Sequence, residues 1–444
     1  MPHVRAVELE DLAPTLSSAE WASGALYFVG DVGATYARLG FGRLADAAAV
    51  VDVVFVRFPM RRGSIREVLD FFAGILARVE GVGGVLSRIR AGVVSVPGPV
   101  SRGGLAGPFN NLDGQIALRE FPRALFPFSR AALLNDVQAG AHGVLALGDA
   151  LTPHYGRFFT RMWGPEGAEE EAEAEADAMQ ANPPNRPQSG VVGEETIGNG
   201  PRANDGRDGN VQDENRAPRS VLGRGPCLVL APGTGLGSAL ILYHEAAHCY
   251  QVLPLEFGCT GVSALVMRAG EEPGKPSLTG LAKRLGCAAW EMKVEDLVCG
   301  SSLVYHYACE AAKDGHARHP ADSPEAIADF AKAGDPAARR ALLAVYTHLF
   351  RCCSNTIMSF LPSNCVIIGD NVVKNQFLLS DAACEKALHD ALHEHSMSKR
   401  GFMSRTTFFR QVKDINLNLL GCLGYGIQLG NSWNKNPIFD EVDS

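Results

Sequence analysis

Apolar residues in this chain fall into short runs separated by turns rich in glycine or polar residues, a pattern typical of buried strands. Apolar residues recur at helical spacing from Ile65 to Val79, and Ser64 with Glu67 three positions later has the capping-box pattern of a helix start. Around that helix, strands are predicted at residues 25–29, 37–41, 50–58 and 91–97. The pattern therefore predicts three strands joined by turns, a helix and a fourth strand.

A similar unit returns in the second half of the chain. Three apolar runs joined by turns predict strands at residues 227–231, 238–243 and 250–255. Between the two units, residues 131–134 predict a strand that leads into a helix over residues 137–147. Duplication of a ribonuclease-H-like unit is characteristic of the actin-like ATPase architecture. We therefore expect an α/β protein with two lobes.

One segment of biased composition interrupts this pattern. Residues 164–220 hold 13 acidic and 5 basic side chains and almost no apolar ones. Such a segment cannot bury enough apolar surface to offset its ordering entropy, so we expect a disordered acidic insert. Outside it, 36 acidic and 36 basic side chains balance. This balance gives no electrostatic case for a nucleic-acid partner.

Neither a membrane partner nor a disulfide framework is expected. No apolar run approaches the ~18–20 residues of a membrane span, and the N-terminus lacks the pattern of a secretory signal. The 11 cysteines are odd in number and include no Cys-x-x-Cys spacing, which indicates reduced thiols. We expect a cytoplasmic protein.

Two glycine-rich turns carry the strongest chemical signal. Residues 30–35 (Gly-Asp-Val-Gly-Ala-Thr) and 232–237 (Pro-Gly-Thr-Gly-Leu-Gly) each join two predicted strands. Backbone N–H groups of such turns, with the hydroxyls of Thr35 and Thr234, suit a polyphosphate, and glycine lets the backbone approach it closely. Asp136 lies where a predicted strand ends, which is where open α/β sheets place their chemistry. This combination predicts phosphoryl transfer from ATP.

Other interpretations of these residues stay open. Asn135 or Asp136 can simply cap the helix that follows, and glycine turns are common structural features. His244-Glu245-Ala246-Ala247-His248 also satisfies the His-Glu-x-x-His pattern of zinc peptidases. That motif needs a helix of several turns, whereas here it lies between two predicted strands. We expect a hairpin loop there, and a metal assay would exclude the peptidase.

Seven segments, in this order along the chain, resemble the motifs of ATP-dependent glucokinases of the bacterial type, which also occur in kinetoplastid and other protozoa. They span residues 31–39, 134–136, 233–237, 253–256, 294–300, 368–371 and 418–421. The resemblance runs from about residue 25 to 430, apart from the insert. It implies the two-lobed actin-like ATPase fold of a sugar kinase, made of duplicated ribonuclease-H-like units.

The resemblance implies phosphorylation of D-glucose to glucose 6-phosphate, with ATP and Mg²⁺ as cofactors and Asp136 as the general base for the sugar hydroxyl. Asp31 is expected to orient the hydration shell of Mg²⁺. The expected sugar-binding residues are Asn135, Asp136, Glu256, Cys259, Glu295 and Asn111, the last in a loop that turn chemistry explains equally well. The expected ATP-binding residues are Gly30, Asp31, Gly33, Ala34, Thr35, Gly233, Thr234, Gly235, Gly237, Gly369 and Asn371.

One departure bears on the substrate. Where the family has Glu-Gly-Gly-His, this chain has Glu256-Phe257-Gly258-Cys259. A thiol is a poorer hydrogen-bond partner than an imidazole, and Phe257 stiffens a turn usually made of paired glycines. A kinase for another hexose, or a non-catalytic sugar-binding protein on the same fold, therefore remains an alternative.

The resemblance also suggests the organisation of the molecule. Residues 22–147, with 421–444 packed on them, are expected to form a small lobe, and residues 148–420 a large lobe that carries the insert. Glucose and ATP are the expected partners, with a second copy of the chain in a homodimer. Relatives in kinetoplastids lie in glycosomes, but no targeting signal is legible here.

Overall fold

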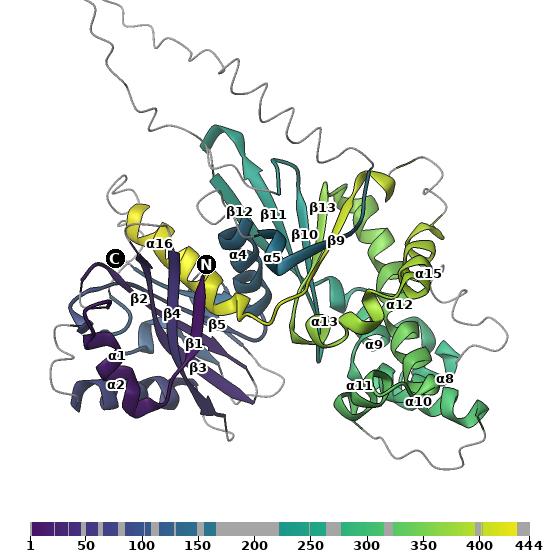
Figure 1. Ribbon diagram of the computed structural model, residues 1–444, viewed down its shortest axis with the longest axis horizontal. Helices are drawn as coiled ribbons and strands as arrows, with labels where there is room; N and C mark the ends of the chain where they lie inside the picture. The colour runs from purple at the N-terminus through teal and green to yellow at the C-terminus, as the bar shows by residue number, and fades with distance from the viewer. Residues whose placement is uncertain are drawn as a thin grey trace, which may run out of the picture.

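The computed structural model describes residues 2–432 except positions 22, 34, 46–49, 61–64, 79–84, 102, 108–114, 128–129, 149–154, 166–221, 248, 263–276, 315–322, 396–400 and 402. Two six-stranded sheets lie side by side, with helices between them and on their outer faces (Figure 1). Among the described residues, no helix is long and apolar enough to cross a membrane.

The first sheet has the strand order β1-β4-β3-β2-β5-β8. Strands β2, β3 and β4 form an antiparallel meander, and β5 and β8 continue the sheet in parallel. Its elements are β1 (His3–Ala6), α1 (Leu9–Ser17), β2 (Leu26–Val32), β3 (Tyr36–Ala45), β4 (Val50–Pro59), α2 (Ile65–Arg78), β5 (Ile89–Val96), the short pair β6 (Leu105–Ala106) and β7 (Ile116–Ala117), η1 (Leu118–Glu120), β8 (Ala131–Asn135) and α4 (Asp136–Gly148). The strands and helices predicted in this region are confirmed.

The second sheet has the order β12-β11-β10-β13-β14-β9. Its strands are β9 (Phe159–Trp163), β10 (Cys227–Pro232), β11 (Leu236–His244), β12 (Cys249–Leu255), β13 (Asn364–Ile367) and β14 (Thr407–Gln411). The α-helices are α5 (Tyr155–Phe158), α8 (Leu278–Leu285), α9 (Val294–Val298), α10 (Gly300–Lys313), α11 (Pro324–Lys332), α12 (Pro336–Phe360), α13 (Asp370–Lys374), α14 (Gln376–Leu379), α15 (Ala382–His393) and α16 (Leu417–Ser432). Short 3₁₀ turns are η2 (Glu245–Ala247), η3 (Phe257–Cys259), η4 (Ala289–Glu291) and η6 (Met403–Arg405).

The two sheets repeat one topology. In each, three antiparallel strands are followed by two parallel ones, β2 to β4 with β5 and β8, and β10 to β12 with β13 and β14. One additional edge strand completes each sheet, β1 in the first and β9 in the second. The predicted duplication, and with it the α/β actin-like fold, is confirmed.

Alternation of side chains along the strands divides the core into three layers. In β2, Leu26 and Phe28 enter an apolar cluster with α1 and α2, whereas Tyr27 and Val29 enter a second cluster with α4 and α16. In β10, Leu228 and Leu230 face a third cluster that holds residues of α8 to α12, and Cys227 and Val229 join the second. The middle layer therefore belongs to both sheets.

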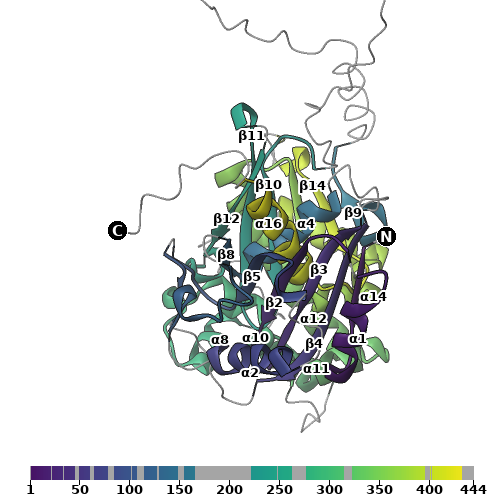
Figure 2. The same cartoon turned by 90° about the vertical axis from the view of Figure 1, so that its left-hand side faces the viewer.

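Helices α4 and α16 form that middle layer (Figures 1 and 2). Helix α4 contacts β10, β11 and β12, while α16 contacts β2, β5 and α4 itself. Nearly every side of α4 is buried, which explains why its sequence is apolar or small all round. The two helices approach closely because glycines lie at the crossing: a Cβ on Gly421 would meet the carbonyl oxygen of Ala139.

Some sequence predictions concern residues outside the described ones, and the first sheet contains a strand that was not predicted. Ser64, of the predicted capping box, lies outside them, as do residues 166–220 of the acidic insert. Strand β1 pairs with β4, so the first sheet begins earlier than the lobe boundary expected at residue 22. The expected lobe boundaries otherwise stay predictions.

Candidate active site

Asn135 and Asp136 lie at the junction of β8 and α4, as predicted. The Oδ1 atom of Asn135 accepts hydrogen bonds from the backbone N–H groups of Val137 at 2.9 Å and Gln138 at 3.3 Å. Its Nδ2 donates to the carbonyl of Gly98 at 2.9 Å. Asn135 therefore caps helix α4. Its capping role also fixes the first turn of the helix, from which Asp136 projects.

The Asp136 carboxyl is partly buried beside two other acids. Its Oδ1 accepts from the Val137 N–H at 2.8 Å. Burial is the main reason that its pKa is raised to about 6, and the negative charges of Asp31 and Glu256 act in the same direction, against the effect of the Val137 hydrogen bond. At neutral pH such a group is largely ionised and close in basicity to its medium, which suits a general base.

Three of the predicted sugar-binding residues come together at the end of β12. The Sγ of Cys259 lies 3.7 Å from Oε2 of Glu256 and donates to it. Burial raises the pKa of the Cys259 thiol, and the charges of Glu295 and Glu256 raise it further. Glu256, Cys259 of η3 and Glu295 of α9 thus form one cluster, called the sugar cluster below, and the negative charge of Glu256 contributes to the raised pKa of Asp136. Asn111 lies outside the described residues.

The unusual Phe257 is accommodated by packing. Its ring is buried in the core cluster of the second sheet's outer face, and its backbone N–H donates to Oγ of Ser238 at 3.2 Å. Gly258 is the position that requires glycine, because a Cβ there would meet the carbonyl oxygen of Leu236. The turn therefore keeps its close approach to β11 despite Phe257.

Both glycine turns close β-hairpins, as predicted. In the first, the Gly33 N–H donates to the Tyr36 carbonyl at 2.9 Å, and in the second, the Gly233 N–H donates to the Gly235 carbonyl at 2.8 Å. Thr35 and Thr234 are exposed at their tips, and Ala34 lies outside the described residues.

The second turn lies against the residues expected to bind sugar. A Cβ on Gly235 would lie 3.1 Å from Oε2 of Glu295. A Cβ on Gly237 would collide with Val137, the residue after the proposed base. The second glycine turn, the residues expected to bind sugar and the start of α4 therefore lie next to one another.

Unlike the exposed threonines at the tips of the two turns, Gly30 and Asp31 are buried within strand β2. A Cβ on Gly30 would lie 2.9 Å from Leu39 and from Val94, so glycine is needed there for packing. The Asp31 carboxylate accepts four hydrogen bonds. Its donors are Ser95 Oγ at 3.1 Å and Asn418 Nδ2 at 3.0 Å to Oδ1, and Arg38 at 2.8 Å and Asn416 Nδ2 at 2.9 Å to Oδ2.

This donor set does not fit the role expected of Asp31 toward Mg²⁺. A metal-bound water donates hydrogen bonds and so needs an open lone pair on the carboxylate. Here N–H and O–H donors fill those positions, and Arg38 supplies the counter-charge. Among the described residues, no group of three or more His, Cys, Asp or Glu side chains forms a metal site.

A cavity of ≈ 200 Å³ opens between the two sheets. It is lined by Asp31, Arg38, Asp136, Val137, Ala231, Ile368, Gly369, Asp370, Gln411, Ile415, Asn416, Leu417 and Asn418. Gly369 has φ 115°, which favours glycine, and its N–H donates to Oε1 of buried Gln411 at 2.9 Å. Asp31 is the one described residue of the two turns in this lining, and Asn371 is exposed beside it in α13.

The His-Glu-x-x-His segment forms a hairpin loop, as predicted. Strands β11 and β12 pair in antiparallel fashion on either side of it, with η2 at the tip. His244 contacts Oε1 of Gln251 at 2.7 Å, and His248 lies outside the described residues. The helix that a zinc peptidase motif requires is therefore replaced by a β-hairpin.

Sequence reasoning missed the residues that surround Asp31 and Gly369. Asn418 belongs to a motif that was recognised and Arg38 to another, yet neither received a role. Ser95, Gln411 and Asn416 carried no signal, because their partners lie far away in the sequence.

Comparison with known proteins identifies the family. The sequence model of the family described as Glucokinase matches residues 211–391. The crystal structure of Leishmania braziliensis glucokinase is 36% identical, covers 97% of this chain and 100% of that chain, and has a TM-score of 0.73. Probable glucokinase 2 of Trichomonas vaginalis is 22% identical over 401 residues, 88% of this chain and 89% of that protein.

A second solved structure supports the fold alone. The glucokinase of Balamuthia mandrillaris in complex with glucose is 21% identical, covers 95% of this chain and 97% of that chain, and has a TM-score of 0.67. The roles of individual site residues stay predictions. The duplicated sheets, the motif residues at their junction and the 36% identity along the whole Leishmania chain together show that this chain belongs to the glucokinase family.

Proposed function

We propose that this protein transfers the γ-phosphoryl group of ATP to the terminal hydroxyl of D-glucose, with Asp136 as the general base. The observation that carries the proposal is the position of Asp136. Asp136 directly follows β8 and lines the cavity, and its pKa is raised to about 6 by burial together with the negative charges of Asp31 and Glu256. A base between an acceptor site and a donor site is what phosphoryl transfer requires.

On the acceptor side, Glu256, Glu295 and Asn135 bind the sugar hydroxyls. The carboxylates accept hydrogen bonds, and Asn135 offers the N–H of its amide that does not donate to Gly98. The bound sugar then places one hydroxyl against Asp136, which takes its proton as the bond to phosphorus forms.

On the donor side, the cavity between the sheets holds ATP, with Mg²⁺ as the counter-ion of its phosphates. The second turn, from Gly233 to Gly237, reaches the transferred phosphate, since Gly235 and Gly237 leave no room for a side chain beside Glu295 and Val137. The first turn, Gly33 to Thr35, approaches it from the other lobe. No described residue is assigned to the ion.

Closure of two lobes, residues 22–147 with 421–444 and residues 148–420, would exclude water from the transferred group. The middle layer of α4 and α16 is the part of the structure about which such a movement would occur, because it contacts both sheets. The expected homodimer and the cytoplasmic or glycosomal location stay predictions.

A coupled assay of ADP release across glucose, mannose, fructose and glucosamine tests this proposal. We expect turnover with glucose at the highest kcat/KM. Cys259 favours one second candidate, a kinase for a different hexose, which a higher kcat/KM for another sugar would support. Absence of ADP release with every sugar would refute both and leave a non-catalytic sugar-binding protein.

A further inference from the structure

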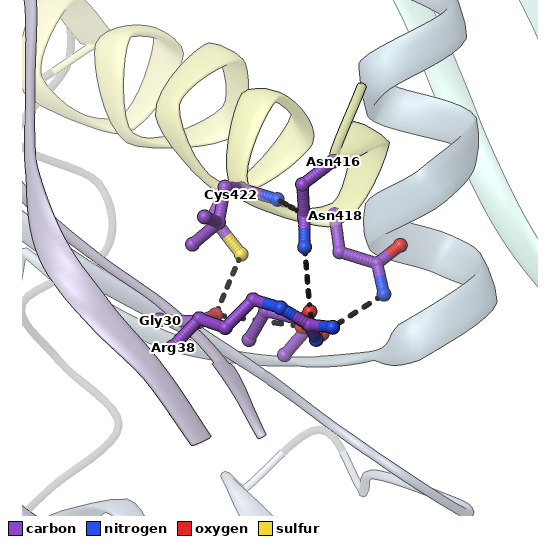
Figure 3. Close-up of polar contacts among 8 residues, drawn as sticks. Gly30, Arg38, Asn416, Asn418 and Cys422 are labelled. Carbon is purple, nitrogen blue, oxygen red and sulfur yellow. Dashed lines mark hydrogen bonds and ion pairs between the residues drawn. The ribbon is translucent and has the colours of Figure 1, made fainter. Parts of the chain in front are cut away.

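The first and last motifs of the chain meet at a single carboxylate. Asp31 is 5% exposed and receives hydrogen bonds from Asn416 and Asn418 at the start of α16, together with those from Arg38 and Ser95 (Figure 3). Cys422, one turn further along α16, donates to the carbonyl of Gly30 at 3.4 Å. The start of α16 is therefore fastened to β2 at several points.

The two asparagines hold the segment in different ways. Oδ1 of Asn416 accepts from the Leu419 N–H at 2.8 Å, so Asn416 caps α16 while its Nδ2 donates to Asp31. Asn418 has its Nδ2 on Asp31, and its Oδ1 lies 3.2 Å from where a Cβ on Gly140 of α4 would be. The segment is thus held between β2 and α4.

The same segment forms one wall of the cavity assigned to the nucleotide. Residues 415–418 line it, together with Asp31 and Arg38. Arg38 is the one basic side chain among the lining residues that the structure describes. Its ion pair with Asp31, at 2.8 Å, also fixes the position of the positive charge that an entering polyphosphate would meet.

We propose that Asp31 is a positioning residue: it clasps Asn416 and Asn418, builds the wall of the nucleotide cavity and orients Arg38, instead of serving the metal ion. This inference rests on the proposed function, since it assigns the cavity to a nucleotide. The clasp joins residues near the two ends of the described chain, and its loss loosens the wall without removing the base.

The clasp is the pair of hydrogen bonds from Asn416 and Asn418 to the Asp31 carboxylate. Two variants distinguish this positioning role from a role in metal binding. Asn418→Ala removes one donor to Asp31 and leaves the cap of α16 intact. Asn416→Ser removes a second donor and retains an oxygen that can cap the helix. Both variants keep the Asp31 carboxylate and leave it with fewer hydrogen-bond donors. Asn364→Ala is the matched control, because that amide makes a comparable half-buried hydrogen bond, 2.7 Å to the Leu222 carbonyl, away from the cavity.

The measurement is calorimetric titration with ADP, once with Mg²⁺ and once with EDTA, and the KM values for ATP and glucose. The clasp predicts roughly five- to tenfold weaker ADP binding in both media for Asn418→Ala and Asn416→Ser. The KM for ATP rises by a similar factor, while the KM for glucose stays within about twofold. Asn364→Ala resembles the parent.

Unchanged ADP affinity of Asn418→Ala in EDTA would overturn the clasp, because the metal role predicts no effect without metal. Failure of the parent protein to bind ADP in either medium would overturn the proposed function, and this inference with it. The two failures are therefore distinguishable. If Asn416→Ser does not fold, Asn418→Ala alone distinguishes the positioning role of Asp31 from a metal role.

Discussion

The ionised Asp136 carboxyl lowers the stability of the folded protein. Its pKa is raised to about 6, first by burial and then by the charges of Asp31 and Glu256. A carboxyl with a raised pKa binds its proton more tightly in the folded state, so the stability of the fold falls as the pH rises from the ordinary value of 3.8 to about 6, and stays lower above that pH. The residue that performs the proposed chemistry should therefore lower the stability of the protein at neutral pH.

Asp136→Asn tests both effects of this carboxyl, on stability and on turnover. The amide keeps an oxygen for the Val137 N–H and cannot ionise, so we expect the melting temperature at pH 7.5 to rise by a few degrees. Turnover should fall roughly 10²–10⁴-fold because the base is lost. Thermal unfolding and steady-state kinetics on the same preparations check both effects. A variant with parental kcat would contradict the assignment of the base.

Cys259 is a second single residue whose replacement should change the affinity for sugar. Cys259→His restores the family's imidazole beside Glu256 and Glu295, where a new hydrogen bond of about 0.5–1.5 kcal/mol would lower the KM for glucose two- to tenfold. Because the contact exists in both ground and transition states, kcat should change less. Kinetics with glucose, mannose and glucosamine measure it. Lost glucose activity, in a parent that prefers another hexose, would show a pocket specialised for that sugar.

At the scale of elements, the pattern of apolar residues predicted the strands of the first sheet except β1, and β10 to β12 of the second sheet. Strands β9, β13 and β14 were not predicted, although β14 ends at Gln411 in the cavity lining. Residues 25–29 and 227–231 alternate between two buried faces, which produces apolar runs that are easy to recognise. Strand β1 was missed because it is an edge strand with mostly exposed side chains. Its pairing with β4 depends on the tertiary structure and leaves no periodic signal.

The crossing of α4 and α16 yields a prediction about packing. Gly421→Ala would place a methyl group against the Ala139 carbonyl and 2.7 Å from the Gly143 nitrogen. Backbone atoms cannot move aside easily, so we expect a loss of about 1–3 kcal/mol in unfolding free energy. Urea denaturation measures this.

Gly74→Ala is the matched control, since nothing lies within 4 Å of the new methyl on helix α2. Alanine there should stabilise by roughly 0.5–1 kcal/mol. Equal effects of the two substitutions would show that the crossing is looser than described.

Across the whole molecule, the parts of the site that sequence could not predict are those that distant segments build. Asp31 and Asn416 are separated by 385 positions, and no local pattern connects them. The burial of Phe257 likewise depends on a core contributed by later helices. The position of Asp136 could be predicted because a strand end, a helix start and a motif coincide within a few residues.

Buried histidines make the stability of the fold depend on pH. His306 of α10 is 1% exposed and 5.3 Å from the ring of His348. Burial lowers its pKa to about 4, although the charge of Glu310 opposes this. Because the unfolded chain takes up the proton first, stability present above about pH 6.5 is lost as the pH falls toward 4.

His306→Leu should flatten that loss by roughly 2–4 kcal/mol between pH 6.5 and 4. The exposed His244 offers the control substitution His244→Leu, which should leave the pH dependence as it is. Unfolding by urea at several pH values compares the three proteins. An identical pH dependence in all of them would mean that burial does not lower the pKa of His306.

The central claim is that Asp136 activates a glucose hydroxyl toward the γ-phosphoryl group of ATP. Phosphorus NMR of the parent protein with MgATP and glucose, beside Asp136→Asn at equal concentration, measures it most directly. We predict glucose 6-phosphate and ADP in equal amounts from the parent, and formation of both roughly 10²–10⁴-fold slower in the variant. Glucose 6-phosphate formed equally by both proteins, or ADP and inorganic phosphate from the parent without a sugar phosphate, would contradict the account.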